Sequence, residues 1–186
     1  MKRFLTFGEP MVMFTAQSEG DLADQMVFQK FVAGAETNVA TGMARLGYDS
    51  YFASRVGKDS LGRYIRKALA QEDIKMDFVS TDDTWPTGFQ MKSHTTHSDP
   101  EVEYFREFAA FRHIPLQGIA SMMVGMDHLH ATGIPLALCE NTRQYGLKMM
   151  TEARKAGMSI SFDPNLRPNL WPSKEEMIRV TNEAAT

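Results

Sequence analysis

Short apolar segments alternate with amphipathic ones along most of this chain, and this alternation constrains the fold more than any other feature. Strand-like runs occur at residues 3–8, 49–57, 127–133 and 158–165. Helical spacing of apolar residues is found at residues 35–47, 58–74 and 140–157, and from Ser173 onward. Strands that alternate with helices in this way form a mostly parallel sheet that helices cover on both faces. We therefore expect an α/β fold with a mostly parallel sheet sandwiched by helices.

Residues that favour helix ends support this interpretation. Gly47 stands where a glycine typically ends a helix in the left-handed conformation. Asp59 or Ser60 is a candidate N-cap for the second helix. Ser173 precedes Glu176 by the spacing of a capping box, in which each side chain bonds the backbone N–H of the other residue. We expect the last helix to begin there.

The middle of the chain has a different pattern. It contains "TGFQMKSHTTHSDPEVEYFREF", in which two alternating segments are separated by turn residues near "HSDP". This pattern predicts a β-hairpin that is more exposed than the segments before it. Because a hairpin does not fit the strand–helix series, we interpret residues 86–108 as part of a small β lid that pairs with residues 11–30.

Composition narrows the classes of function. The 186 residues are 43% apolar, which is enough for a core, and the formal net charge of −3 gives no sign of a nucleic-acid-binding surface. Cys139 is the single cysteine, so we expect a reducing, cytoplasmic setting. No apolar run approaches membrane-spanning length, and we expect no membrane partner. The histidines lack metal-ligand spacing and are expected to be structural or solvated: His94, His97, His113, His128 and His130.

Two loops have polar side chains suited to a ligand, since ligands of open α/β sheets bind at the carboxyl ends of strands, on the loops that enter helices. In "AGAETN", Gly34 permits close backbone approach and Asn38 offers a donor and an acceptor to sugar hydroxyls. A glycine turn with a capping Asn is the equally open alternative. In "SFDPNLRPNLWP", Asn165 follows the strand and Arg167 suits a carboxylate or phosphate. The alternative there is a structural pair of Arg167 with Asp163.

The hairpin supplies a third candidate. In "YFRE", Tyr104 and Arg106 are two residues apart and would share one face of a strand. A solvated surface strand is the ordinary interpretation of such a pair. The two side chains gain a role in binding only if the hairpin lies over a site.

These segments together resemble the ribokinase-like (PfkB) carbohydrate kinases. "AGAETNVATGMARLGYDSYFASRVGKDSLG" is similar to the first family signature, which has a glycine pair, a sugar-binding Asn and a G-x-D-x-x-G pattern, here Gly57, Asp59 and Gly62. Ala33 replaces the first glycine of the pair. "FDPNLRPNLWPS" resembles the family's D-P-N-x-R segment, and the likeness spans all 186 residues. It implies the ribokinase-like fold.

Within the family, "FGEP", "GAETNVA", "ATGIPLAL" and "EYFRE" most resemble 2-keto-3-deoxygluconate kinases, and fructokinases are the alternative. Fructokinases have an Asp that bonds sugar hydroxyls where this chain has Met13. A thioether cannot replace a carboxylate acceptor, so a neutral sugar held in that way is disfavoured. Arg106 and Arg167 favour a substrate with its own carboxylate.

The resemblance also implies which residues bind which ligand. The sugar acid would be contacted by Gly34, Asn38, Gln90, Tyr104, Arg106, Ile134 and Arg167. Asn165 and Arg167 would lie near the phosphate transferred from ATP, which Mg²⁺ accompanies. Some relatives have an aromatic contact residue at the position of Gln90.

The family's catalytic base is an Asp in a G-A-G-D segment, which these 186 residues lack. We therefore expect residues 1–186 to be the N-terminal part of one ribokinase-like domain, without the C-terminal ATP-binding half and without a catalytic residue of their own. A sugar-acid kinase is the first hypothesis, and a non-catalytic sugar-acid binding module is the second. The family likeness also implies a homodimer through the lid.

Overall fold

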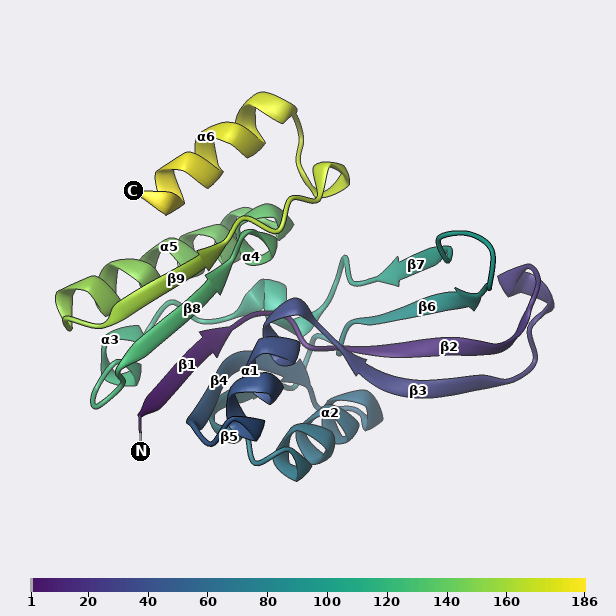
Figure 1. Cartoon of the computed structure of the whole chain (residues 1–186), viewed down its shortest axis with the longest axis horizontal. Coiled ribbons are helices and arrows are strands. Elements are labelled where there is room, and N and C mark those ends of the chain that lie inside the picture. Colours follow the sequence, from purple (N-terminus) through teal and green to yellow (C-terminus); the bar gives the residue numbers. More distant parts are fainter. Residues whose placement is uncertain (1) are drawn as a thin grey trace.

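The computed structural model describes residues 2–186 and contains two sheets, a large one in the body and a smaller one that projects from it (Figure 1). The large sheet has the strand order β5-β4-β1-β8-β9, and all neighbouring pairs are parallel. Its strands are β1 (Arg3–Phe7), β4 (Asp49–Gly57), β5 (Lys75–Asp82), β8 (His128–Thr132) and β9 (Ser159–Asp163). The expected α/β fold with a parallel sheet is confirmed. The sequence analysis missed β5.

Helices cover both faces of this sheet. They are α1 (Ala35–Arg45), α2 (Ser60–Gln71), α3 (Ile119–Met122), α4 (Gly133–Leu138), α5 (Glu140–Lys155) and α6 (Lys174–Ala185). The 3-10 helices η1 (Leu22–Asp24), η2 (Ala110–His113) and η3 (Pro168–Leu170) lie in connections. Adjacent residues of β4 point to opposite faces: Phe52 packs with Ala40 of α1 and Ile65 of α2, whereas Ala53 packs in the cluster that contains α5.

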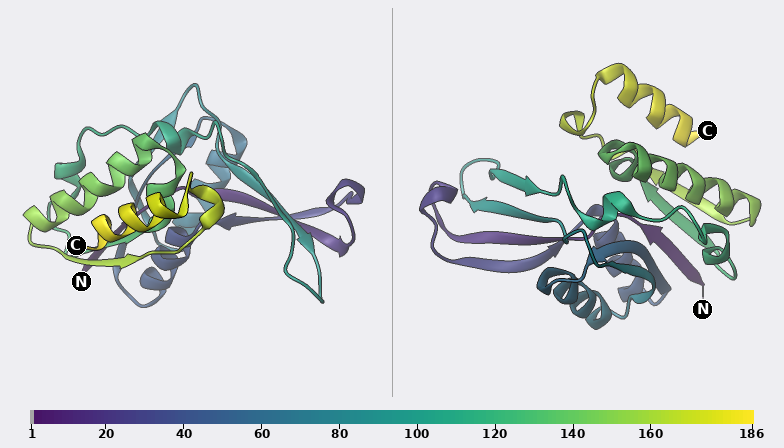
Figure 2. Two further views of the ribbon diagram at one scale, coloured as in Figure 1. Left: turned by 90° about the horizontal axis from the view of Figure 1, so that it is seen from above. Right: turned by 180° about the vertical axis from the view of Figure 1, so that it is seen from behind.

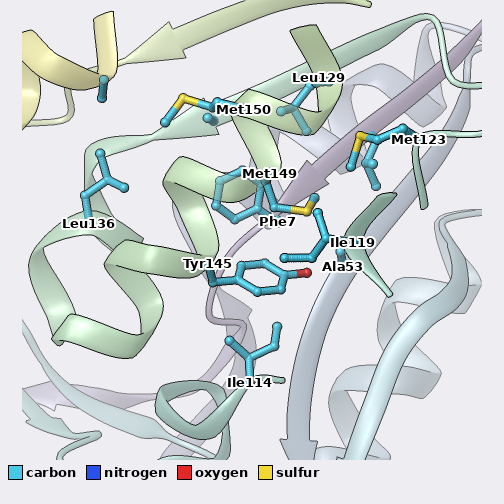
Figure 3. Packing of buried hydrophobic residues seen from close by; sticks show 14 of the residues in the cluster. Phe7, Ala53, Ile114, Ile119, Met123, Leu129, Leu136, Tyr145, Met149 and Met150 are labelled. Carbon is cyan, nitrogen blue, oxygen red and sulfur yellow. The ribbon is translucent and has the colours of Figure 1, made fainter. Parts of the chain in front are cut away.

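The larger core cluster lies between the sheet and α5 (Figure 3). Phe7 of β1 meets Tyr145 of α5 edge-on with ring centroids 5.7 Å apart, and both side chains are fully buried. Met149 of α5 and Leu129 of β8 are also fully buried in this cluster. Burial of apolar side chains on this scale is the main term that stabilises a domain of this size. The periodic apolar residues of the sequence thus form the core that was expected.

The helix ends agree with the sequence in most respects. Asp59 caps α2, because its Oδ1 accepts a hydrogen bond from the Gly62 N–H at 2.7 Å. Ser173 caps α6 by accepting from the Glu176 N–H at 3.1 Å. The other half of the predicted capping box is wrong. The Glu176 carboxylate instead forms an ion pair of 2.7 Å with Arg143 of α5, so it ties two helices together.

The smaller sheet, called the lid sheet, has the order β3-β2-β6-β7. Its strands are β2 (Met11–Glu19), β3 (Phe28–Ala33), β6 (Phe89–His94) and β7 (Val102–Phe105). Two antiparallel hairpins join through the parallel pair β2 and β6. Figure 2 shows the lid sheet extending away from the body. The predicted hairpin and its pairing with the earlier segment are confirmed, with strands at 11–33 and 89–105.

The G-x-D-x-x-G residues fasten the lid sheet to the body. Asp59 accepts hydrogen bonds from the Thr87 N–H at 2.7 Å and from the Thr87 hydroxyl at 2.9 Å, just before β6. A Cβ atom at Gly57 would lie 2.7 Å from the Thr87 nitrogen, so only glycine fits there. These residues hold the start of β6 against the N-terminus of α2.

The chain crosses between body and lid sheet four times, and the crossings meet at Glu9. Glu9 lies between β1 and β2, and its Oε2 accepts from Arg106 Nε at 2.8 Å and also from Arg106 Nη2, just after β7. At the other two crossings, a Cβ on Gly34 would lie 3.1 Å from the Glu9 carbonyl oxygen, and one on Gly88 would lie 2.6 Å from Glu9 Oε1. The Glu9–Arg106 pair is thus enclosed by every segment that leads into the lid sheet.

Two absences apply to residues 2–186. No helix there is long and apolar enough to cross a membrane. No group of three or more His, Cys, Asp and Glu side chains in that range could hold a metal ion. The His128 and His130 rings instead form hydrogen bonds with Ser159 and Ser161.

Glu9→Ala should destabilise the protein strongly, because it leaves the buried Arg106 guanidinium without its counter-charge. The cost of breaking a buried pair in this way is roughly 3–5 kcal/mol. Urea denaturation of the variant and the parent protein measures it. Asp83→Ala is the matched control, since it removes the partner of an exposed pair with Lys58 and should change stability far less. An equal loss in both variants would contradict the role assigned to Glu9.

Candidate functional site

A pocket of about 450 Å³ lies between the base of the lid sheet and the carboxyl ends of β8 and β9. It is lined by Glu9, Met11, Ala33, Gly34, Ala35, Glu36, Asn38, Gln90, Tyr104, Arg106, Ile134, Asp163, Asn165 and Arg167. This set includes each of the residues that the sequence analysis assigned to binding, from Gly34 to Arg167. Six separate segments of the chain therefore converge on one cavity.

A second hollow, of about 550 Å³, lies near the amino ends of the strands. Arg3 at the start of β1 and Ser159 at the start of β9 contribute to it, with His128 and His130. Ligands of open α/β sheets bind at the opposite, carboxyl edge. Position in the fold therefore favours the smaller pocket as the functional site, and the larger hollow contains none of the candidate residues.

The turn into α1 forms one wall of the pocket. Gly34 has a φ of 148°, and a Cβ atom there would lie 2.9 Å from Thr37 Oγ1, so glycine is required. Asn38 is exposed in the first turn, and the N-terminus of α1 has no side-chain cap. The alternative that Asn38 serves as the cap is wrong. Asn38 lines the pocket, and its side-chain amide has no hydrogen-bond partner among residues 2–186.

The lid sheet forms the opposite wall. Gln90 of β6 and Tyr104 of β7 are direct partners in the antiparallel register, so both side chains lie on one face. Gln90 is buried, whereas Tyr104 is 56% exposed. Arg106 lies one residue beyond the end of β7 rather than within the strand as expected, and its guanidinium carbon is 5.8 Å from the centre of the Tyr104 ring. The expected convergence of Tyr104 and Arg106 on one site is nevertheless found.

Arg106 is not a solvated residue of a surface strand, because it is buried against Glu9. Burial raises the pKa of the Glu9 carboxyl, and the Arg106 guanidinium acts in the opposite direction. Glu9 was not identified from the sequence as a site residue. The "FGEP" segment contains it, but an acidic residue beside a proline ordinarily indicates an exposed turn. A ligand carboxylate in the pocket would share Arg106 with Glu9.

Glu36 is a second buried acid that the sequence analysis did not identify. Its Oε1 accepts a hydrogen bond from the hydroxyl of Thr132, at the end of β8. The Thr132 hydroxyl also accepts from the Ile134 N–H at 3.2 Å and so fixes the start of α4, where Ile134 lines the pocket. Burial raises the pKa of Glu36 to about 7.

The loop after β9 supplies the remaining polar groups. Asp163 Oδ1 accepts from the Asn165 N–H at 2.9 Å, and Asn165 has a φ of 41°, so this loop makes a tight turn. The Arg167 side chain is exposed, and its Nη1 bonds only the Leu166 carbonyl, at 2.9 Å. Arg167 forms no ion pair with Asp163 or another acid in residues 2–186, so the structural alternative is wrong. Its charge is available to a ligand.

The sequence matches that of known carbohydrate kinases throughout. The family described as pfkB family carbohydrate kinase matches residues 1–186. A 2-dehydro-3-deoxygluconokinase of Bacillus subtilis is 39% identical over 183 residues, which make up 97% of this chain and 56% of that protein. Fructokinases of Klebsiella pneumoniae and Salmonella typhimurium are also similar. This chain spans about half the length of the curated relatives that it matches.

Solved structures agree with this assignment. A PfkB protein from Polaromonas sp. is similar with a TM-score of 0.94 and 43% identity, covering 100% of this chain and 63% of that one. A sugar kinase of Pyrococcus horikoshii, solved in complex with ATP, has a TM-score of 0.87 and 29% identity, covering 97% and 59%. With the family match over its whole length and this shared fold, the chain belongs to the pfkB family of carbohydrate kinases.

Proposed function

We propose that the full-length protein transfers the γ-phosphate of ATP to 2-keto-3-deoxygluconate. The observation that carries this proposal is the convergence of Arg106 and Arg167 on a pocket that also presents neutral polar groups. Guanidinium groups suit a carboxylate, and the amides of Asn38 and Gln90 suit sugar hydroxyls. A sugar acid is the class of substrate that matches both.

Met13 argues against a neutral sugar held as in fructokinases. It pairs in register with Gln90, which lies across from Tyr104, so Met13 belongs to the pocket side of the lid sheet. Its thioether is only a weak acceptor and cannot replace the carboxylate that the family resemblance places there in fructokinases. The Bacillus subtilis relative named 2-dehydro-3-deoxygluconokinase supports the same substrate.

The residues of this chain would bind and orient the substrate. Arg106 and Arg167 would hold its charged end, and Asn165 and Arg167 would lie near the phosphate as it transfers. The catalytic base and the ATP site would lie in the rest of the protein, as the resemblance implies. Mg²⁺ would bridge phosphate oxygens of ATP. Residues 2–186 hold no group of three or more acidic or histidine ligands for it, so we assign no metal ligand among them.

Pairing of two copies through their lid sheets is a further part of the proposal. The strands β3 and β7 are the edges of this sheet, and Phe31 and Tyr104 are exposed apolar side chains upon it. An exposed sheet edge with apolar side chains is a surface to which another chain can add. A cytoplasmic location stays a prediction of the sequence.

Substrate preference tests the proposed reaction. We expect the full-length protein to release ADP in the presence of 2-keto-3-deoxygluconate with a higher kcat/KM than with fructose. The physical reason is that a neutral sugar brings no anion to Arg167, which has no acidic partner among the described residues. A coupled ADP-release assay measures both values. A higher kcat/KM for fructose would overturn the substrate assignment, and binding of the sugar acid without turnover would favour a binding module.

Arg167→Ala should lower kcat/KM for the sugar acid, because the complex with the substrate would lose a positive charge that faces the anion. The transition state should lose stabilisation on the order of 2–5 kcal/mol, which is the cost of removing one partner from a desolvated charge pair. Steady-state kinetics of the full-length variant measures it. Arg179→Ala, which removes an exposed cation of α6, is the control and should leave kcat/KM unchanged. Equal kcat/KM in Arg167→Ala and the parent would remove Arg167 from the site.

A further inference from the structure

Glu36 is an acid built into the wall of a pocket that is proposed to bind an anion. Its side chain is only 1% exposed, and it lines the same cavity as Arg106 and Arg167. It forms no ion pair with a cation in the described chain, and its Oε1 accepts a hydrogen bond from the hydroxyl of Thr132. A Cβ atom on the neighbouring Gly8 would overlap the Glu36 carboxyl group, so the backbone is shaped around it.

The charge of the pocket depends on the protonation of Glu36. The charged residues that line the pocket are Glu9, Glu36, Arg106, Asp163 and Arg167. The two arginines balance Glu9 and Asp163, so the lining is formally neutral when Glu36 carries a proton and negative when it is ionised. Arg112 of η2 adds a weaker positive field that acts on Glu9. An ionised Glu36 would oppose the entry of a carboxylate, whereas the protonated form adds a hydrogen-bond donor.

We propose that Glu36 is a specificity residue that admits the anionic substrate in its protonated form, so that binding of the sugar acid takes up one proton from water. This inference rests on the proposed function. No covalent bond changes in the step: the proton moves from solvent to Glu36 and remains there while the anion is bound. Protonation of Glu36 thereby removes a negative charge that would repel the anionic ligand.

In the free protein, the pKa of Glu36 already lies where the side chain can take up a proton near neutral pH. Burial raises the pKa of Glu36 to about 7. The Thr132 hydrogen bond, a hydrogen bond from the Glu36 backbone N–H and the Arg106 charge act in the opposite direction, and the Glu9 charge adds a smaller upward effect. A bound carboxylate would raise this pKa further. Below the free-state pKa, Glu36 is protonated beforehand, and binding is insensitive to pH. Above it, each binding event requires a proton, so the apparent Kd should rise by up to about tenfold per pH unit.

Isothermal titration of the full-length protein with 2-keto-3-deoxygluconate tests the inference. Titrations in two buffers of different ionisation enthalpy give the number of protons taken up, at pH values below and above 7. We expect uptake near zero at low pH and approaching one proton above pH 7, with the matching rise in Kd. Glu36→Gln retains the acceptor for Thr132 and should bind without uptake and without pH dependence.

Glu103→Gln is the matched control, because Glu103 is an exposed acid of the lid sheet outside the pocket. It should behave like the parent protein. Binding by the parent without proton uptake would overturn the coupling alone, and so would equal uptake in Glu36→Gln. Absence of binding at every pH would refute the substrate assignment and the coupling with it. The parent protein decides the question even if Glu36→Gln fails to fold.

Discussion

The buried pair of Glu9 and Arg106 joins the two parts of the molecule. Glu9 stands where the chain first leaves the body, and Arg106 stands where it last returns. Removing both charges from water costs several kcal/mol for each ion, and a buried pair persists only if its geometry recovers that cost. Here two guanidinium nitrogens, Nε and Nη2 of Arg106, both donate to Oε2 of Glu9. The pocket exists because this pair fixes the lid sheet over the carboxyl ends of the strands.

The glycines near this pair follow from the same constraint. Gly8 leaves room for the Glu36 carboxyl group, Gly88 for Glu9 Oε1, and Gly34 for the Glu9 carbonyl oxygen. A side chain at Gly8 or Gly88 would displace a buried carboxyl group, and one at Gly34 would press on the Glu9 backbone and on Thr37. Glu9 Oε1 is buried and has no hydrogen-bond partner among the described residues. A buried acceptor without a partner lowers stability, so the pair depends on its contacts through Oε2. These three glycines are thus as necessary to the pocket as its charged residues.

Much of the fold could be predicted from the sequence, because periodic apolar residues and turn residues act locally. Loop positions made Gly34, Asn38 and Arg167 candidate site residues, whereas Gln90 and Ile134 were expected only from the family resemblance. Asp59 and Ser173 cap helices as their spacing indicated. Glu9 and Glu36 could not be found in this way, since acidic residues are exposed in most proteins and only tertiary packing buries these two. The second half of the capping box failed because Arg143, far away in sequence, competes for Glu176. Contacts between residues far apart in sequence therefore determine which acidic side chains are buried and which partner each one has.

The central position of β1 has a consequence for the time course of folding. The strand is made before both of its partners, β4 and β8, in which Tyr51 and Leu129 pair with Leu5. Contacts between residues so far apart in sequence form slowly. Until β8 has emerged from the ribosome, one edge of β1 has no strand to pair with, and such edges promote aggregation. Leu5 and Phe7, which are completely buried in the finished protein, therefore stay partly uncovered in the growing chain until β8 is available.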